Sequence, residues 1–159
     1  MSHSRRQILF LPLSTPAPVL PRVRVAPLAA INGVPFDFRY PEARHEAFVV
    51  RLGGDAEAGV GPGGDIVAFL RACPHMGCSL SEVDTRAGTL GPCVCHFSLF
   101  NLKRGGTQIY GRATQNLVRV LLEVVDEGGE AMIHAYGLTG LPYGEALTVG
   151  QALSREGAR

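Results

Sequence analysis

The sequence contains no tryptophan, few charged residues (18%) and no uninterrupted apolar run long enough to cross a membrane. A membrane-spanning helix needs about 20 predominantly apolar residues, so we expect no transmembrane span in this sequence. The formal net charge is only +1, and the lysines and arginines do not gather into clusters. Nucleic-acid binding usually requires a basic patch or stripe, so we expect no nucleic-acid partner.

Long helical patterns are lacking as well, because no segment repeats its apolar residues at helical spacing over three turns. Glycine (20) and proline (11) are frequent among the 159 residues, which suits one domain of short strands and turns. Short apolar or alternating segments predict strands, at residues 22–26, 34–38, 47–52, 65–72, 117–125 and 131–136. We therefore predict an all-β fold built from antiparallel sheets or a barrel.

All four cysteines fall in two short segments that also carry two of the histidines. Residues 73–78 read Cys-Pro-His-Met-Gly-Cys, and residues 93–98 read Cys-Val-Cys-His-Phe-Ser. Together they provide Cys-x-His and Cys-x-x-His, the signature of a Rieske centre. In such a centre two thiolates hold one iron of a 2Fe–2S cluster and two imidazoles hold the other. The leading hypothesis is a carrier of single electrons.

Side-chain directions indicate which residues bind the cluster. His96 adjoins Cys95, and neighbouring side chains on a tight turn point apart, so both are not expected to bind one small cluster. Cys93 and His96 can converge, as can Cys73 and His75 on an extended loop. We predict that the two thiolates of Cys73 and Cys93 bind one iron and the two imidazoles bind the other.

Cys78 and Cys95 remain, one in each segment. Two loops that converge on one cluster bring these residues close, so we predict a disulfide, with two free buried thiols as the alternative. In the chain-entropy model, closing a loop of about 15 residues stabilises a fold by about 3 kcal/mol. Such bonds persist outside the reducing cytosol. A non-redox zinc-binding module is a remote alternative, because zinc accepts the same ligand types.

Around these residues the chain resembles the high-potential Rieske proteins, whose boxes read Cys-x-His-x-x-Cys and Cys-x-Cys-His. In that family the two extra cysteines form a disulfide, which supports the pairing of Cys78 with Cys95. A narrower resemblance, over about residues 22–147, is to the small subunit of arsenite oxidase. It rests on both Cys/His segments and on further stretches at residues 61–68, 105–106, 111–122 and 137–144.

The resemblance implies an electron-transfer subunit of a molybdenum arsenite oxidase. A large subunit with a molybdopterin centre and a 3Fe–4S cluster would oxidise arsenite, and the small subunit would pass electrons to a soluble cytochrome c or cupredoxin. No catalytic residue is expected in this chain, and the imidazoles of His75 and His96 would form the electron-transfer edge. The alternative is a related molybdenum enzyme such as iodate reductase, because the substrate is chosen by the other subunit.

The chain departs from the quinol-oxidising Rieske proteins of cytochrome bc complexes at two positions. Phe97 and Phe100 stand where those proteins have glycine and tyrosine. Ser98 is retained and can donate a hydrogen bond to a cluster sulfur, whereas Phe100 cannot. Because such hydrogen bonds tune the reduction potential, we predict a potential below that of the quinol-oxidising relatives, within about −150 to +300 mV. We also expect residues 111–117 to form a third loop over the cluster.

We divide the chain into a leader or arm (1–21), a Rieske domain (22–150) with a cluster-binding lobe at about 70–116, and a tail (151–159). The leader contains Ser-Arg-Arg-Gln-Ile-Leu, which resembles a twin-arginine export motif. Several prolines shorten its apolar stretch, so a proline-rich arm is the alternative. Since the twin-arginine route carries folded proteins with cofactors, we expect export to the periplasm.

Overall fold

The computed structural model describes residues 20–145. The predicted tail and all but the last two residues of the predicted leader lie outside the described residues. Between residues 20 and 145 the chain forms ten β-strands and two short 3₁₀ helices, and no α-helix. The predicted all-β class is therefore confirmed. No helix in this part of the chain has the length and apolar character needed to cross a membrane.

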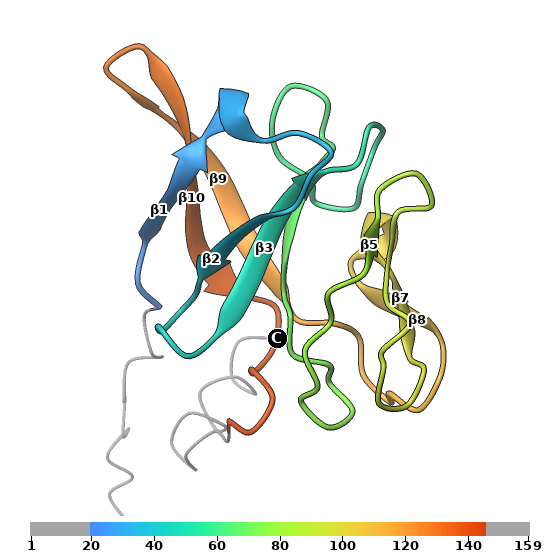
Figure 1. Ribbon diagram of the computed structural model, residues 1–159. Coiled ribbons are helices and arrows are strands. Elements are labelled where there is room, and N and C mark those ends of the chain that lie inside the picture. Colours follow the sequence, from blue (N-terminus) through green and yellow to red (C-terminus); the bar gives the residue numbers. More distant parts are fainter. Residues whose placement is uncertain (1–19, 146–159) are drawn as a thin grey trace, which may run out of the picture. The chain divides into compact units, whose positions relative to one another are not determined.

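Six strands form one antiparallel sheet, in the order β1-β10-β9-β4-β3-β2. Figure 1 shows this sheet curling so that its two edge strands, β1 and β2, approach each other in a partly closed barrel. The strands and the 3₁₀ helix η1 are β1 (Val23–Pro27), η1 (Leu28–Ala30), β2 (Phe36–Arg39), β3 (Glu46–Arg51), β4 (Ile66–Leu70), β9 (Arg119–Glu127) and β10 (Glu130–Leu138).

The central strands β3 and β4 separate two hydrophobic cores. Successive side chains of a strand point to opposite faces of its sheet. On one face, Ala47, Val49, Ile66, Ala68 and Leu70 pack inside the barrel. On the other face, Phe48, Val50, Val67 and Phe69 pack toward the smaller sheet. Both faces of this pair are buried, which explains why β4 is a continuous apolar run and does not alternate.

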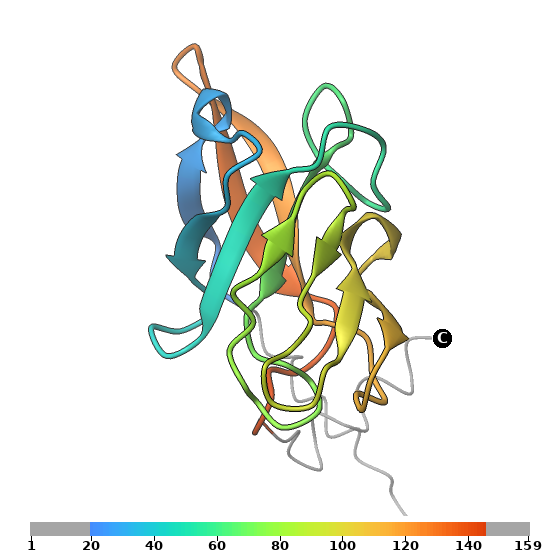
Figure 2. The same cartoon turned by 45° about the vertical axis from the view of Figure 1, so that its right-hand side comes forward.

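A second antiparallel sheet, in the order β5-β6-β7-β8, forms the cluster-binding lobe (Figure 2). Its elements are β5 (Val83–Asp84), β6 (Thr89–Leu90), β7 (Leu99–Asn101), the 3₁₀ helix η2 (Leu102–Arg104) and β8 (Thr107–Tyr110). Between the two Cys/His segments, β5 and β6 form a short hairpin. Leu90, Phe100 and Leu102 are completely buried and join the core that contains Phe48 and Phe69. The lobe is thereby fixed to the outer face of β3 and β4.

Strand β9 pairs with β4 only at its beginning, through Val120 and Arg119. Farther along it pairs with β10 alone, as a hairpin that projects beyond the sheet in Figure 1. Val120 and Leu122 are buried, but Val124 is 39% exposed. The regular apolar pattern of residues 117–125 therefore continues past the end of the core that it covers.

Candidate metal centre

The first Cys/His segment, residues 73–78, forms a loop directly after β4, closed by two backbone hydrogen bonds. The Cys73 N–H donates to the Cys78 carbonyl oxygen (2.8 Å), and the Gly77 N–H donates to the Cys73 carbonyl oxygen (2.8 Å). An isolated bridge between Ala72 and Ser79 holds the two ends of the loop together. We call this segment the first loop.

The second Cys/His segment, residues 93–98, connects β6 to β7 and repeats the same pattern. The Cys93 N–H donates to the Ser98 carbonyl oxygen (2.9 Å), and the Phe97 N–H donates to the Cys93 carbonyl oxygen (2.8 Å). This second loop therefore has the same hydrogen-bonded frame as the first. In each loop the opening cysteine occupies the first of six positions.

Both loops need a left-handed backbone at their fifth residue. The first loop has Gly77 there, with φ of 74°, and the second has Phe97, with φ of 59°. Glycine adopts this conformation without steric conflict. For other residues it costs about 1–3 kcal/mol and is tolerated where the surroundings or a function require it. Phe97 is therefore a strained residue inside the candidate site.

The four predicted ligands lie at the end of the molecule that the two loops form. Cys73 and Cys93 are each 1% exposed and belong to the core of the lobe. His75 and His96 lie closer to solvent, with their Nδ1 atoms 3.2 Å apart and their ring planes almost perpendicular. The thiols thus lie inside the protein, and the imidazoles lie nearer its surface.

Burial raises the pKa of the Cys73 thiol, and the neighbouring Cys93 thiol raises this pKa further. The backbone N–H groups of His75 and Met76 act in the opposite direction, because they donate hydrogen bonds to the Cys73 sulfur. Without a cation, burial therefore favours the protonated form of the Cys73 thiol. Bound metal ions deprotonate coordinating thiols, so a buried thiol pair with N–H donors around its sulfur fits the thiolate end of an iron–sulfur cluster.

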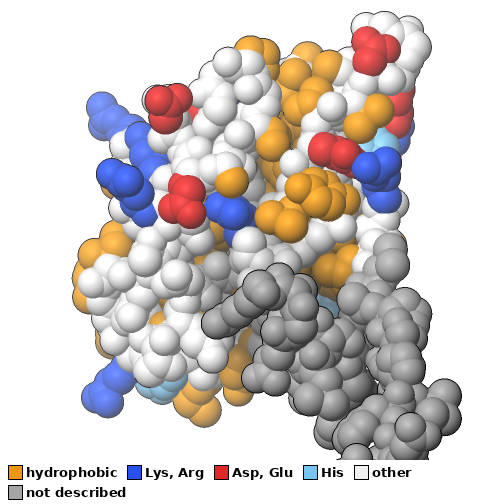
Figure 3. Space-filling view, turned by 180° about the vertical axis from the view of Figure 1, so that it is seen from behind, with side chains coloured by type: hydrophobic (Ala, Val, Ile, Leu, Met, Phe, Trp, Pro, Cys, Tyr) orange, Lys and Arg blue, Asp and Glu red, His pale blue; other side chains and the backbone are white. Residues whose placement is uncertain are grey.

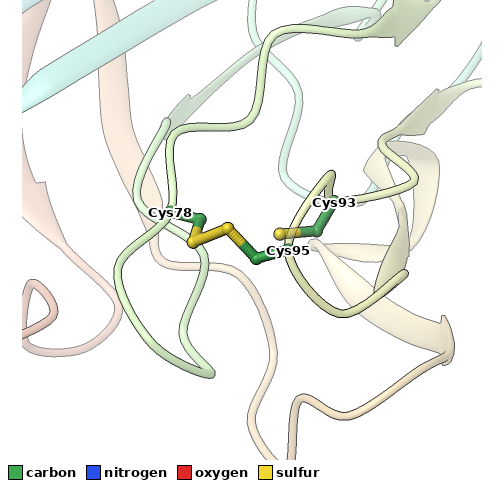
Figure 4. Close-up of side chains that lie close together, drawn as sticks. All are labelled: Cys78, Cys93 and Cys95. Atoms are coloured by element: carbon green, nitrogen blue, oxygen red, sulfur yellow. A yellow bond between two sulfur atoms is a disulfide. The ribbon is translucent and has the colours of Figure 1, made fainter.

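The predicted disulfide between Cys78 and Cys95 is present and joins the first loop to the second (Figure 4). The sulfur of Cys93 lies close by, because the sulfur atoms of these three cysteines are all within 4.8 Å of one another. Cys78 and Cys95 use their sulfurs for the bond between them, so this group is not a site of three thiolates. The disulfide instead holds the two ligand loops together.

The predicted third loop, residues 111–117, lies against the second loop. A Cβ atom at Gly111 would overlap the backbone of Ser98 and Phe97, so only glycine allows this approach. The Ala113 N–H donates a hydrogen bond to the Ser98 hydroxyl oxygen (2.9 Å). Ser98 is completely buried. Its hydroxyl proton is not used in this bond and can be donated to another acceptor.

Phe100 lies on β7 in the same core as Cys73 and Cys93, and it is completely buried. Its ring provides packing but no hydrogen-bond donor. The predicted contrast between Ser98 and Phe100 therefore has a structural basis. Both residues are completely buried, Phe100 in the same core as the predicted thiolate ligands, and only the serine carries a proton to donate.

Sequence reasoning gave no role to Tyr143, which follows β10 and lies over the first loop. A Cβ atom at Gly77 would be 2.5 Å from the Tyr143 Cδ1 atom, so the tyrosine ring packs directly on that glycine. The sequence did mark this segment, because residues 137–144 belong to the stretches that carry the family resemblance. No spacing rule indicated that a segment more than 60 residues away covers the first loop.

Residues 39–121 match the Rieske [2Fe-2S] domain family. The chain belongs to this family. The predicted Rieske-type 2Fe–2S cofactor is therefore confirmed, and the zinc-binding alternative is set aside.

Among solved structures, the soluble domain of Rieske protein II (soxF) from Sulfolobus acidocaldarius has the same fold. The TM-score is 0.68 at 25% identity, and the match covers 81% of this chain and 83% of that one. The family and this neighbour together confirm the Rieske fold with its inserted cluster-binding lobe.

Two curated relatives are described as iodate reductase subunit IdrB. The protein from Denitromonas iodatirespirans is 39% identical over 126 residues, and the one from Pseudomonas sp. (strain SCT) is 40% identical over 125 residues. The matches cover 78% and 77% of this chain but only 66% and 63% of the relatives. The chain thus spans slightly less than two thirds of their length. These names agree with the iodate reductase alternative and not with the arsenite oxidase prediction.

Proposed function

We propose that the chain is the electron-transfer subunit of a molybdenum oxidoreductase of the iodate reductase kind. The observation that carries the proposal is the 39–40% identity to two iodate reductase subunits over more than three quarters of the chain. The Cys/His centre described above supplies the redox group that such a subunit requires.

When bound, the 2Fe–2S cluster accepts and releases one electron at a time, with a potential raised by its two histidine ligands. The protein surrounds the cysteine side and the histidine side of the cluster site differently. Cys73 and Cys93 lie in a buried core, whereas His75 and His96 reach the surface. The imidazole side is therefore the edge at which another redox protein can approach closely.

The loops are held so that little of the protein has to move when the charge of the centre changes. Each loop is closed by its own two hydrogen bonds, and the disulfide between Cys78 and Cys95 joins them. The buried hydroxyl of Ser98 is fixed by the Ala113 N–H. A donor fixed beforehand would need no reorganisation when a bound cluster takes up an electron.

Two partners follow from the proposed role. One is a large subunit with a molybdopterin centre and a 3Fe–4S cluster, where the substrate reacts. The other is a soluble cytochrome c or a cupredoxin that exchanges electrons with the small subunit. A disulfide that joins both ligand loops suits an oxidising compartment. Together with the twin-arginine-like leader, it supports a periplasmic location.

Arsenite oxidase is the second candidate, supported by the resemblance over about residues 22–147. The two candidates differ in the substrate of the large subunit and in the direction of electron flow. No residue of this chain selects between iodate and arsenite, since the proposal places the substrate on the other subunit.

The test is to purify the chain with its partner from the native host and to analyse the complex for iron and molybdenum. Iodate-dependent oxidation of a reduced cytochrome c or cupredoxin would support the proposal. Arsenite-dependent reduction of the same carriers would support the second candidate. A chain that purifies alone, or with a partner that lacks molybdenum, would overturn both.

A further inference from the structure

We propose that the exposed ring of Phe97 is the anchor through which the second loop binds the molybdenum-containing partner subunit. This inference rests on the proposed function and specifies which residues of the chain make the contact. The partner is expected to offer an apolar pocket for the ring and an acidic group close to it.

Large hydrophobic side chains are exposed around the histidine edge. Val94 is 75% exposed, Phe97 66% and Met76 57%. Figure 3 shows hydrophobic and histidine side chains side by side at the end of the molecule that carries the two loops. Tyr110 extends the patch, because it pairs with Leu99 directly after the second loop and is half exposed. Contiguous exposed apolar groups of this kind mark interaction sites.

The backbone at Phe97 gives a second, independent argument. Its left-handed conformation is unfavourable for a bulky side chain. Phe97 is also mostly exposed, so packing against residues 20–145 compensates little. Glycine would satisfy the same loop, as Gly77 does at the equivalent position of the first loop. A strained residue whose side chain packs little within its own fold indicates that the side chain contacts another molecule.

The two loops also differ in what covers them. The chain itself covers the fifth residue of the first loop, because the Tyr143 ring packs on Gly77. At the same position of the second loop the aromatic ring belongs to Phe97 itself and is mostly exposed. Within residues 20–145 no side chain covers Phe97 as the Tyr143 ring covers Gly77. A partner surface would complete the cover.

The charge around the patch indicates the chemistry of the partner surface. The two Cys/His loops and residues 111–117 contain no aspartate or glutamate. Arg112 is exposed and has no ion pair within the described part of the chain. It lies between Gly111 and Ala113, which both contact the second loop. An apolar surface with an acidic group opposite Arg112 fits this arrangement.

The apolar character of the patch favours a stable partner over a transient one. Obligate interfaces are larger and more hydrophobic than those of brief redox encounters. The large subunit would stay bound, whereas a soluble electron carrier must leave after each transfer. We therefore assign the Phe97 patch to the large subunit.

The test compares Phe97→Gly and Phe97→Asn with the wild-type chain. Both replacements accept a left-handed backbone and remove the ring. Each cluster-loaded variant is titrated against the molybdenum-containing subunit isolated from the wild-type complex. We expect the affinity to fall at least tenfold, while the unfolding temperature of the isolated variant stays equal to that of the wild type or rises. Val34→Ala, at a residue 71% exposed outside the loops, should bind like the wild type.

A structural role for the ring would instead lower the unfolding temperature and leave the affinity of the folded fraction unchanged. Binding within twofold of wild type for both Phe97 variants would overturn this inference alone, since the complex itself would still exist. An equal loss of affinity for Val34→Ala would overturn it as well. If no molybdenum-containing partner exists, the proposed function and the inference both fail.

Discussion

The first loop (73–78) and the second loop (93–98) have the same backbone hydrogen bonds but different surroundings at their fifth residue. Gly77 lies under a ring supplied by Tyr143, whereas Phe97 carries its own ring into solvent. Within residues 20–145, Tyr143 covers the first loop, whereas the fifth residue of the second loop stays mostly exposed. The difference shows that two loops with the same backbone hydrogen bonds can leave very different side-chain surfaces at equivalent positions.

The loops also place their side chains differently on the same frame. The opening cysteine is equivalent in both, but the histidine is the third residue of the first loop and the fourth of the second. The third position of the second loop is Cys95, which bonds to Cys78 at the sixth position of the first. Because the histidine stands one position later in the second loop, the third position of that loop can hold Cys95, which forms the disulfide with Cys78.

The equivalence of the opening cysteines is tested by Cys73→Ser and Cys93→Ser, for which we expect the largest effect. Each replacement removes a buried thiol that no other described residue can supply, because Cys78 and Cys95 are bonded to each other. We expect almost complete loss of the cluster in both variants, measured as iron content and as the EPR signal of the reduced protein. Retention of the cluster in only one variant would contradict the equivalence.

The disulfide that joins the two loops is tested by the double replacement Cys78→Ala with Cys95→Ala. Loss of a native disulfide of this loop length destabilises a fold by about 2–4 kcal/mol. We expect denaturant unfolding of the cluster-loaded protein to shift by that amount and cluster loss to become faster. The Val34→Ala variant serves as the control. An unchanged midpoint would mean that the loops are held together without the bond.

The different surroundings of the fifth residue are tested by Gly77→Ala and Phe97→Gly. Alanine at position 77 would have an unfavourable φ and a Cβ atom 2.5 Å from the Tyr143 ring, so we expect destabilisation of about 1–3 kcal/mol. Phe97→Gly relieves strain and should leave the free energy of unfolding unchanged or higher.

Chemical denaturation of both variants measures this contrast. Adding Tyr143→Ala to Gly77→Ala should recover part of the loss, because the overlap with the ring disappears while the unfavourable φ remains. Equal destabilisation by Gly77→Ala and Phe97→Gly would refute the contrast between the loops.

Much of this architecture could be predicted from the sequence because local chemistry determines it. The Cys/His spacing gave the cofactor, and the two spare cysteines gave the disulfide. The strands of the six-stranded sheet followed from apolar runs such as residues 65–72. The strands β7 and β8 did not, because three or four residues form them and the burial of Phe100 depends on the neighbouring sheet.

The contact of Tyr143 with Gly77 could not be predicted either, since it joins segments far apart in the sequence. The arsenite oxidase assignment shows a different limit. The chain carries the redox group but not the substrate site, so its residues specify the family more firmly than the reaction.

The smallest predicted effect concerns how the second loop and β7 tune the centre. Phe100→Tyr adds a hydroxyl donor to the core that contains Cys73 and Cys93. A net hydrogen bond of about 1 kcal/mol to the cluster corresponds to about 40 mV for a one-electron couple, so the reduction potential should rise by roughly that amount in protein-film voltammetry. Ser98→Ala should lower it by a similar amount, because it removes the buried hydroxyl that the Ala113 N–H fixes. A rise for Phe100→Tyr without a fall for Ser98→Ala would mean that the serine only connects the second loop to residues 111–117.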